Sequence, residues 1–108
     1  MVVVRFYRTA RGRLTGFKVK GHSNAGRYGE DIVCAAVSAI TVTAANALEK
    51  VAGIDVSHRV WDGFLYVRLP GRLSGKQKAE ADIILRTLLL GVREIEDQYP
   101  RRVRLCNA

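Results

Sequence analysis

Apolar and polar residues alternate along the start of the chain, first from Val2 to Tyr7 and again from Leu14 to Lys20. A period of two residues is that of a β-strand with one buried face, and a glycine suited to a turn lies between the two stretches. We therefore expect a β-hairpin. In its second strand Gly16 marks either a bulge or an ordinary strand position. This strand ends at Gly21 and His22, which predicts that His22 stands at an edge of the sheet.

The run from Ile32 to Leu48 contains no charged residue. We interpret it as part of a helix from Asp31 to about Ala52, with Gly53 placed to end it in the left-handed conformation that helix C-termini favour. A helix without charge over such a length has to be covered on most sides. Its serine, threonine and asparagine residues argue against a membrane span, which needs about 20 predominantly apolar residues. We expect a core helix and no membrane contact.

Two further patterns complete the chain. The residues from Asp55 to Pro70 alternate on either side of Asp62-Gly63, a strong signal for a hairpin turn. Lys76 to about Gln98 carries an apolar face at helical spacing, with Ser74 placed to cap its first turn. A short last strand follows at 101–106. The order ββαββαβ predicts an α+β fold, with two helices packed on a mostly antiparallel sheet, in a single domain spanning residues 1–108.

Composition places the chain among ordinary globular domains. It has 108 residues, of which 48% are hydrophobic and 26% charged, enough for one core and unlike disordered or fibrous chains. The two cysteines, Cys34 and Cys106, make neither a metal-binding spacing nor a disulfide framework. We therefore predict no metal, no cofactor and a reducing, cytoplasmic location. The first residues also lack the layout of a signal peptide.

The net charge of +8 is unevenly distributed along the chain. Seven arginines and lysines precede the first acidic residue, Glu30, and three arginines lie together near the end. Such a surface attracts phosphate backbones or acidic partners. A solvated, soluble surface has the same appearance, and none of the sequence motifs of nucleic-acid binding is present. A weak contact with RNA or the ribosome is therefore one interpretation of two.

Candidate chemistry is concentrated between His22 and Ser38. With Asp31 as N-cap, Cys34 falls in the first helical turn, where unpaired N–H groups and the helix dipole favour a negative charge. A thiol there is expected to ionise more readily than a free one. His22 is separated from Cys34 by a loop of eleven residues. An imidazole beside a thiolate is the arrangement that thiol acyl transfer needs, because it can take the thiol proton and later return one to the leaving amine.

Each of these residues also has a plainer interpretation. A lone cysteine in an apolar helix is usually core, and His58, on a predicted strand, rivals His22 as the base. Asp31 either caps the helix or orients the imidazole. Ser38, one turn beyond Cys34, either donates a hydrogen bond near the thiolate or bonds back to its own helix. Cys106 has no comparable partner, and we interpret it as incidental.

The segment from Ser23 to Glu30 has the composition of a loop, with Gly26 and Gly29 among its residues. Because it joins the two candidate catalytic residues, it is either a lid that orders when substrate binds or a passive connector. The aromatic side chains that could shape a substrate groove, or simply pack, are Tyr28, Phe64 and Tyr66.

Gly21-His22, a loop ending in Gly29, and then Asp31-Ile-Val-Cys34-Ala-Ala-Val-Ser38 resemble the signature of the Prp family, the bacterial ribosomal-processing cysteine proteases. The resemblance covers most of the chain. It implies a small cytoplasmic, homodimeric endopeptidase that removes an N-terminal extension from a large-subunit ribosomal protein precursor. It also implies that His22 and Cys34 form the catalytic dyad. Ser23 departs from the alanine expected in most members, a change between two small residues.

Two other functions remain open on the residues alone. One is a non-enzymatic basic module that binds ribosomal RNA and in which Cys34 is structural. Such a module should show salt-sensitive RNA affinity and an unreactive Cys34, whereas a protease should show fast alkylation that depends on His22. The other is a thiol enzyme that acts on a different acyl group, which would share the dyad and differ only in substrate.

Overall fold

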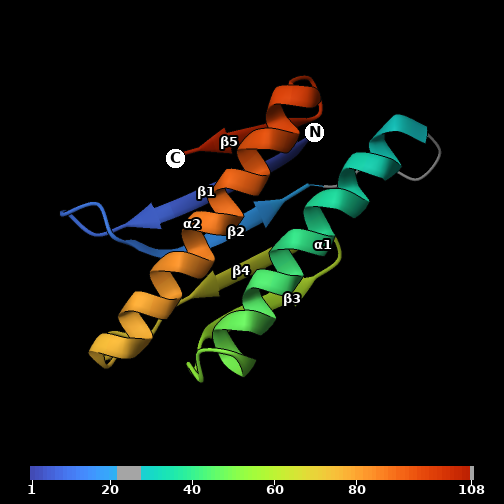
Figure 1. Cartoon of the computed structure of the whole chain (residues 1–108). Helices are drawn as coiled ribbons and strands as arrows, with labels where there is room; N and C mark the ends of the chain where they lie inside the picture. Colours follow the sequence, from blue (N-terminus) through green and yellow to red (C-terminus); the bar gives the residue numbers. More distant parts are fainter. Residues whose placement is uncertain (22–27, 108) are drawn as a thin grey trace.

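The computed structural model describes the backbone of residues 1–21 and 28–107, and the side chains of these residues except 28–31. A five-stranded sheet forms one layer, with strand order β3-β4-β2-β1-β5, and two long helices form the other (Figure 1). The predicted α+β class and the order ββαββαβ are confirmed. The elements are β1 (Val2–Arg8), β2 (Leu14–Lys20), α1 (Tyr28–Lys50), β3 (Ser57–Trp61), β4 (Phe64–Arg68), α2 (Gly75–Gln98) and β5 (Val103–Cys106).

All neighbouring strands are antiparallel except β1 and β5, which run parallel. The register of β1 against β2 shifts between Tyr7 and Arg8, so the predicted bulge exists beside Gly16. A Cβ atom on Gly16 would lie 2.3 Å from the carbonyl oxygen of Val67, so position 16 of β2 requires a glycine for β4 to pair here. The strand that leads to His22 is the middle strand of the sheet. The strand ends at Lys20, and the prediction that His22 stands at an edge of the sheet lies outside the described residues.

The start of α1 also differs from prediction. The helix begins at Tyr28, one turn before Asp31, so Asp31 is a helical residue and not the N-cap. Cys34 is the seventh residue of the helix and not the third, beyond the four N–H groups that a helix start leaves unpaired. The end agrees better with prediction. Lys50 lies in the last turn, and Gly53 has φ +65° and is followed by a bond from the Ile54 N–H to the Leu48 carbonyl at 2.9 Å.

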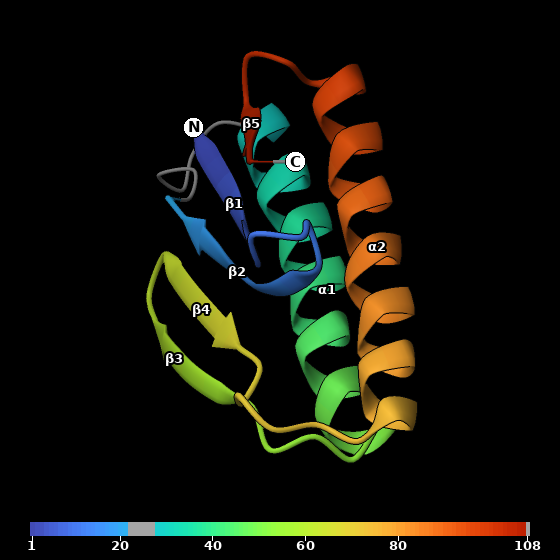
Figure 2. The ribbon, with the colours of Figure 1, turned by 90° about the vertical axis from the view of Figure 1, so that its left-hand side faces the viewer.

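The core lies between the sheet and the two helices, which stand side by side on one face of the sheet (Figure 2). Phe6 and Phe17 are fully buried and pack with their ring centroids 6.1 Å apart. From α1, Val33 and Leu48 enter the same core. By length and composition alone, Ile32–Lys50 is apolar enough to cross a membrane, a test that core helices of soluble proteins also pass.

The second half of the chain follows its local signals closely. Ser74 caps α2 in a reciprocal capping box, in which its hydroxyl accepts from the Gln77 N–H at 3.1 Å and the Gln77 side chain accepts from the Ser74 N–H at 3.1 Å. Trp61 faces Phe64 across the predicted turn, where Gly63 has φ +71°. These short-range features fix the second hairpin and the start of α2.

Candidate active site

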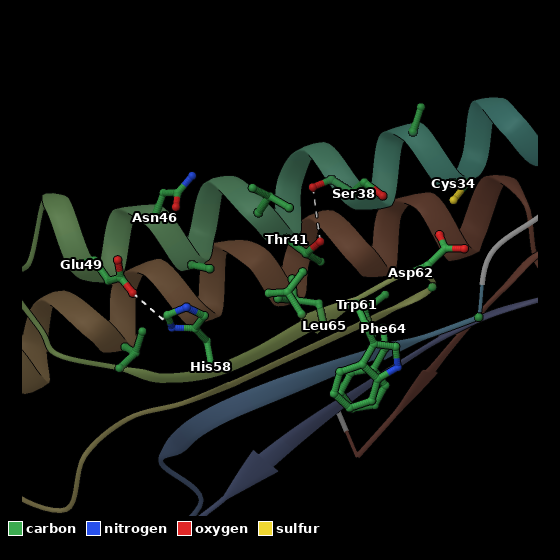
Figure 3. Close-up of a pocket in the computed structure, with 18 residues that line it drawn as sticks. Cys34, Ser38, Thr41, Asn46, Glu49, His58, Trp61, Asp62, Phe64 and Leu65 are labelled. Carbon is green, nitrogen blue, oxygen red and sulfur yellow. Dashed lines mark hydrogen bonds and ion pairs between the residues drawn. The ribbon is translucent and has the colours of Figure 1, made fainter.

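A cavity of about 620 Å³ lies between α1 and the hairpin formed by β3 and β4 (Figure 3). Its helical wall is a stripe at spacings of three and four residues, which places every member on one face of α1. Glu49 lies fifteen residues beyond Cys34, about 22 Å along the axis at 1.5 Å per residue. The cavity is therefore an elongated groove with Cys34 near one end. The stripe comprises Cys34, Ser38, Thr41, Ala45 and Glu49.

Cys34 is half-buried and makes no disulfide. Its neighbour on the helix Val33, and Val37 one turn on, are each 1% exposed and anchor that side of α1 in the core. The helical rotation of about 100° per residue turns Cys34 from this core side toward the groove. The interpretation of Cys34 as an ordinary core cysteine therefore does not fit, because its thiol borders a cavity that a substrate can enter.

The polar residues next along the stripe differ in role. The hydroxyl of Thr41 is buried and donates to the Val37 carbonyl at 2.7 Å, with a longer contact of 3.4 Å to the Ser38 carbonyl. Thr41 is thus the residue that bonds back to its own helix. Ser38 is exposed, and its hydroxyl makes no hydrogen bond to the other described residues. It remains available to a group bound beside Cys34.

The opposite wall at the Cys34 end is the turn of the second hairpin. Asp62 and Gly63 line the cavity, and Figure 3 shows the Asp62 carboxylate toward the Cys34 end of α1. The Gly21 N–H donates to the Gly63 carbonyl at 2.9 Å, and Gly21 also lines the cavity. The chain is therefore fixed to this wall one residue before His22. Sequence reasoning treated Asp62 only as a turn residue, because no local signal shows that the turn meets α1.

Several predicted site residues lie wholly or partly beyond the described structure. His22 and Gly26 are outside the described residues. For Tyr28, Gly29 and Asp31 the structure gives the backbone alone, and all three are helical. The helix therefore begins inside the segment 23–30 that was predicted to be a loop.

The rival base, His58, lies at the far end of the groove. Its Nδ1 is 3.6 Å from the Glu49 carboxylate, and Figure 3 places this pair away from Cys34. Since Glu49 is about 22 Å along the helix from Cys34, His58 cannot reach the thiol within the 2.6–3.2 Å or so that proton transfer needs. His58 is therefore excluded as the base in this arrangement.

The two predicted groove aromatics with described side chains belong to different surroundings. Phe64 borders the cavity and stacks on Trp61, with centroids 4.1 Å apart and an interplanar angle of 4°. Tyr66 does not border it and packs edge-on against Tyr7 at 6.0 Å, so of its two interpretations the structure favours packing. Within the described part of the chain no three His, Cys, Asp or Glu side chains are grouped as a metal site.

Comparison with known proteins gives this geometry a context. The family model described as "Cysteine protease Prp" matches residues 1–104. The chain belongs to the Prp family of cysteine proteases. It is 30% identical over 107 residues to the ribosomal processing cysteine protease Prp of Staphylococcus aureus, with 97% of each chain covered.

Solved structures of Prp from S. aureus agree with the fold. One, in complex with a substrate peptide, has a TM-score of 0.83, 29% identity and 97% of each chain covered. Another, with a covalently linked product peptide, has a TM-score of 0.82, 30% identity and 98% of each chain covered. Membership in the Prp family confirms the predicted enzyme class, a cysteine protease, and decides against the non-enzymatic module. Of the two cysteines in the chain, Cys34 borders the groove, whereas Cys106 lies on the outer strand β5.

Proposed function

We propose that this protein is an endopeptidase that removes an N-terminal extension from a large-subunit ribosomal protein, with Cys34 as nucleophile and His22 as its base. The observation that carries the proposal is the position of the half-buried Cys34 at one end of a groove about 22 Å long. An extended peptide rises about 3.3 Å per residue, so the groove suits six or seven residues of an unfolded terminal segment. A folded domain would not enter it.

In this mechanism the His22 imidazole takes the Cys34 proton, and the thiolate attacks the carbonyl carbon of the scissile peptide bond. The tetrahedral intermediate collapses, the C–N bond breaks, and the imidazolium gives its proton to the leaving amine. Water then attacks the thioester with His22 again as base, which releases the new carboxylate and restores the thiol. The peptide covalently linked to S. aureus Prp is the kind of adduct that such a mechanism forms.

Because α1 begins one turn earlier than predicted, activation of the Cys34 thiol depends more on His22 and less on the helix terminus. Cys34 lies in the second turn of α1, whereas the field of a helix terminus acts mainly within the first turn. The helix terminus therefore contributes little to stabilising the thiolate, which leaves more of the activation to a base beside it. Gly21, held to the hairpin turn that borders the Cys34 end of the groove, supports His22 in this role.

The outer side of the helix pair supports a homodimer as the working form. Ile83 and Leu90 are 65% and 57% exposed on α2 and border a shallow apolar depression between the two helices. Ala39, a small exposed residue on α1, allows a second copy to approach closely. Light scattering should show a dimer that Leu90→Glu dissociates, and a monomeric unmodified protein would contradict this part of the proposal. The two free cysteines agree with a cytoplasmic location.

Mass spectrometry of the ribosomal precursor after incubation with the protein tests the proposal. The unmodified protein and the matched control Cys106→Ala should make a single N-terminal cut, and Cys34→Ala and His22→Ala should make none. Cleavage by folded Cys34→Ala would rule out the mechanism. If the precursor survives every protein while Cys34 is still alkylated rapidly in a His22-dependent way, the substrate is wrong but the dyad stands.

A further inference from the structure

One face of the sheet carries no helix. Figure 2 shows α1 and α2 on the same side of the five strands, with the other side bare among the described elements. Residues directly opposite each other in neighbouring strands point to the same face. Phe6 opposite Phe17 faces the helices and is buried, so the pairs one residue away face outward. We call this outward side the open sheet face.

The open sheet face is strongly basic. The strand register brings six arginine and lysine side chains onto it from all five strands, and the five described strands contain no aspartate or glutamate. All ten acidic residues of the chain lie in helices and connecting segments. The net charge of +8 is therefore concentrated here and not spread evenly. The six side chains are Arg5, Lys18, Lys20, Arg59, Arg68 and Arg104.

The arrangement of these charges is unfavourable for the fold itself. Arg5 lies directly opposite Lys18 in the β1–β2 pair, and both are half-buried. Like charges directly opposite each other destabilise a sheet. A bound polyanion removes the repulsion, because each phosphate can neutralise one of the two cations. The Arg5–Lys18 pair is therefore explained by anion binding and not by a contribution to the stability of the sheet.

Aromatic side chains lie among the cations on the same face. Trp61 is 57% exposed and stacks on Phe64, which lies opposite Lys20. Figure 3 shows these two rings on the side of the hairpin turned away from α1. Tyr66, opposite Lys18, contacts Tyr7 edge-on. Flat aromatic rings interleaved with basic side chains on a sheet are what stacked bases and their phosphates require.

We propose that the open sheet face binds single-stranded RNA, with the basic side chains on phosphates and the exposed ring of Trp61 stacked on a base. The choice of RNA over other polyanions rests on the proposed function, because a protease that cleaves a ribosomal protein precursor acts where RNA is present. The basic side chains lie on the face of the sheet opposite Cys34, whereas Trp61 and Phe64 also border its groove. The RNA phosphates would therefore lie on one side of the β3–β4 hairpin and the peptide on the other, with Trp61 and Phe64 at the boundary between them.

The single tryptophan of the chain makes a direct probe. Titration of the full-length Cys34→Ala protein with a 12-nucleotide oligouridine should quench its fluorescence as Trp61 stacks on a base. Anisotropy of the labelled oligonucleotide, measured from 50 to 200 mM salt, gives the affinity. Single-stranded RNA should bind more tightly than an RNA duplex or heparin, and a DNA strand of the same length distinguishes RNA from nucleic acid in general. Saturable binding without quenching would overturn the proposal, and so would equal affinity for duplex or heparin, or tighter binding of the DNA strand.

Two matched variants test which charges act. Arg5→Ser with Lys18→Ser should lower affinity at least tenfold and reduce the salt slope by about 1.4, at about 0.7 per phosphate contact of a single strand. Arg86→Ser with Arg93→Ser removes the same charge from α2, beside the β1–β2 turn, and should change affinity less than twofold. Equal losses of affinity in the two double variants would show that RNA responds to the overall positive charge, and would refute binding at the open sheet face.

Folding and catalysis are controlled separately. Because it removes a like-charge pair, the Arg5/Lys18 variant should melt no lower than the parent protein, so lost binding cannot be attributed to unfolding. Trp61→Leu should weaken binding at least about fivefold, the effect of losing one stacked base. Peptide cleavage enters none of these readouts. RNA binding without precursor cleavage would therefore leave this inference standing while the proposed substrate fails.

Discussion

Gly21→Ala should be far more destabilising than its matched control Gly12→Ala. The two glycines have nearly the same backbone angle, φ +91° and φ +89°, and any L-residue there pays about 1–2 kcal/mol for the left-handed region. At Gly12 an added Cβ meets nothing within 4 Å. At Gly21 it would lie 2.4 Å from the carbonyl oxygen of Met1. The Met1 carbonyl cannot move away freely, because the N–H of the next residue, Val2, donates to the Arg102 carbonyl at 2.8 Å.

The clash should add about 1–2 kcal/mol, within the usual range for overpacking, so Gly21→Ala should lose about 2–4 kcal/mol and Gly12→Ala about 1–2 kcal/mol. Urea unfolding followed by circular dichroism gives both values, with an unchanged m-value confirming that only stability differs. At roughly 4 °C per kcal/mol for a domain of this size, the melting temperatures should fall by about 8–16 °C and about 4–8 °C.

Equal losses in the two variants would refute the argument from the Met1 contact. A second readout separates stability from function. At a temperature where both variants are folded, kcat/KM should fall only in Gly21→Ala, because Gly21 fixes the chain to the hairpin turn just before His22. Unchanged kcat/KM in folded Gly21→Ala would show that this attachment does not position the site.

Three further outcomes are expected. Asp62→Asn should lower kcat/KM, because its carboxylate borders the Cys34 end of the groove, and Glu49→Gln at the far end serves as the control. A larger loss of kcat/KM in Glu49→Gln would reverse the assignment. Ser74→Ala should lower the free energy of unfolding by about 1 kcal/mol, because it removes the capping box of α2. The urea midpoint measures this change, and an unchanged midpoint would mean that water replaces the cap. Leu85 is fully buried, so Leu85→Ala should lower the free energy of unfolding by about 2–5 kcal/mol in the same assay. A decrease below about 1 kcal/mol would contradict the place of Leu85 in the core.

Features encoded by neighbouring residues could be predicted from the sequence. The Asp62-Gly63 turn, the Ser74 cap and the left-handed Gly53 each depend on a few adjacent residues, and each was found where expected. The place of Ser38 one turn beyond Cys34 also followed from helical spacing. In each case the signal and the structure it determines lie within one or two turns of the chain.

Features that depend on how distant segments meet could not be predicted. Nothing local indicates that Asp62 faces α1, or that His58 pairs with Glu49 at the far end of the groove. The helix start was misplaced because Asp31 is a good N-cap by type, and a polar, glycine-containing segment before it favours a loop. The basic face required the strand order, since residues 59, 68 and 104 join residues 5 and 18 on one face only when β4 and β5 flank the first hairpin.

The parallel pairing of β1 with β5 has a consequence for how this protein folds. Val2 pairs with Val103, so this contact joins nearly opposite ends of the sequence. Contacts of such separation carry the largest loop-closure entropy and tend to form late, whereas both hairpins and both helices close over short distances. During synthesis, the first hairpin is made well before β5, so Val2 and Val4 lack their neighbours on β5 until residues 103–105 are made. We therefore expect the pairing of β1 with β5 to be among the last contacts of the native sheet to form.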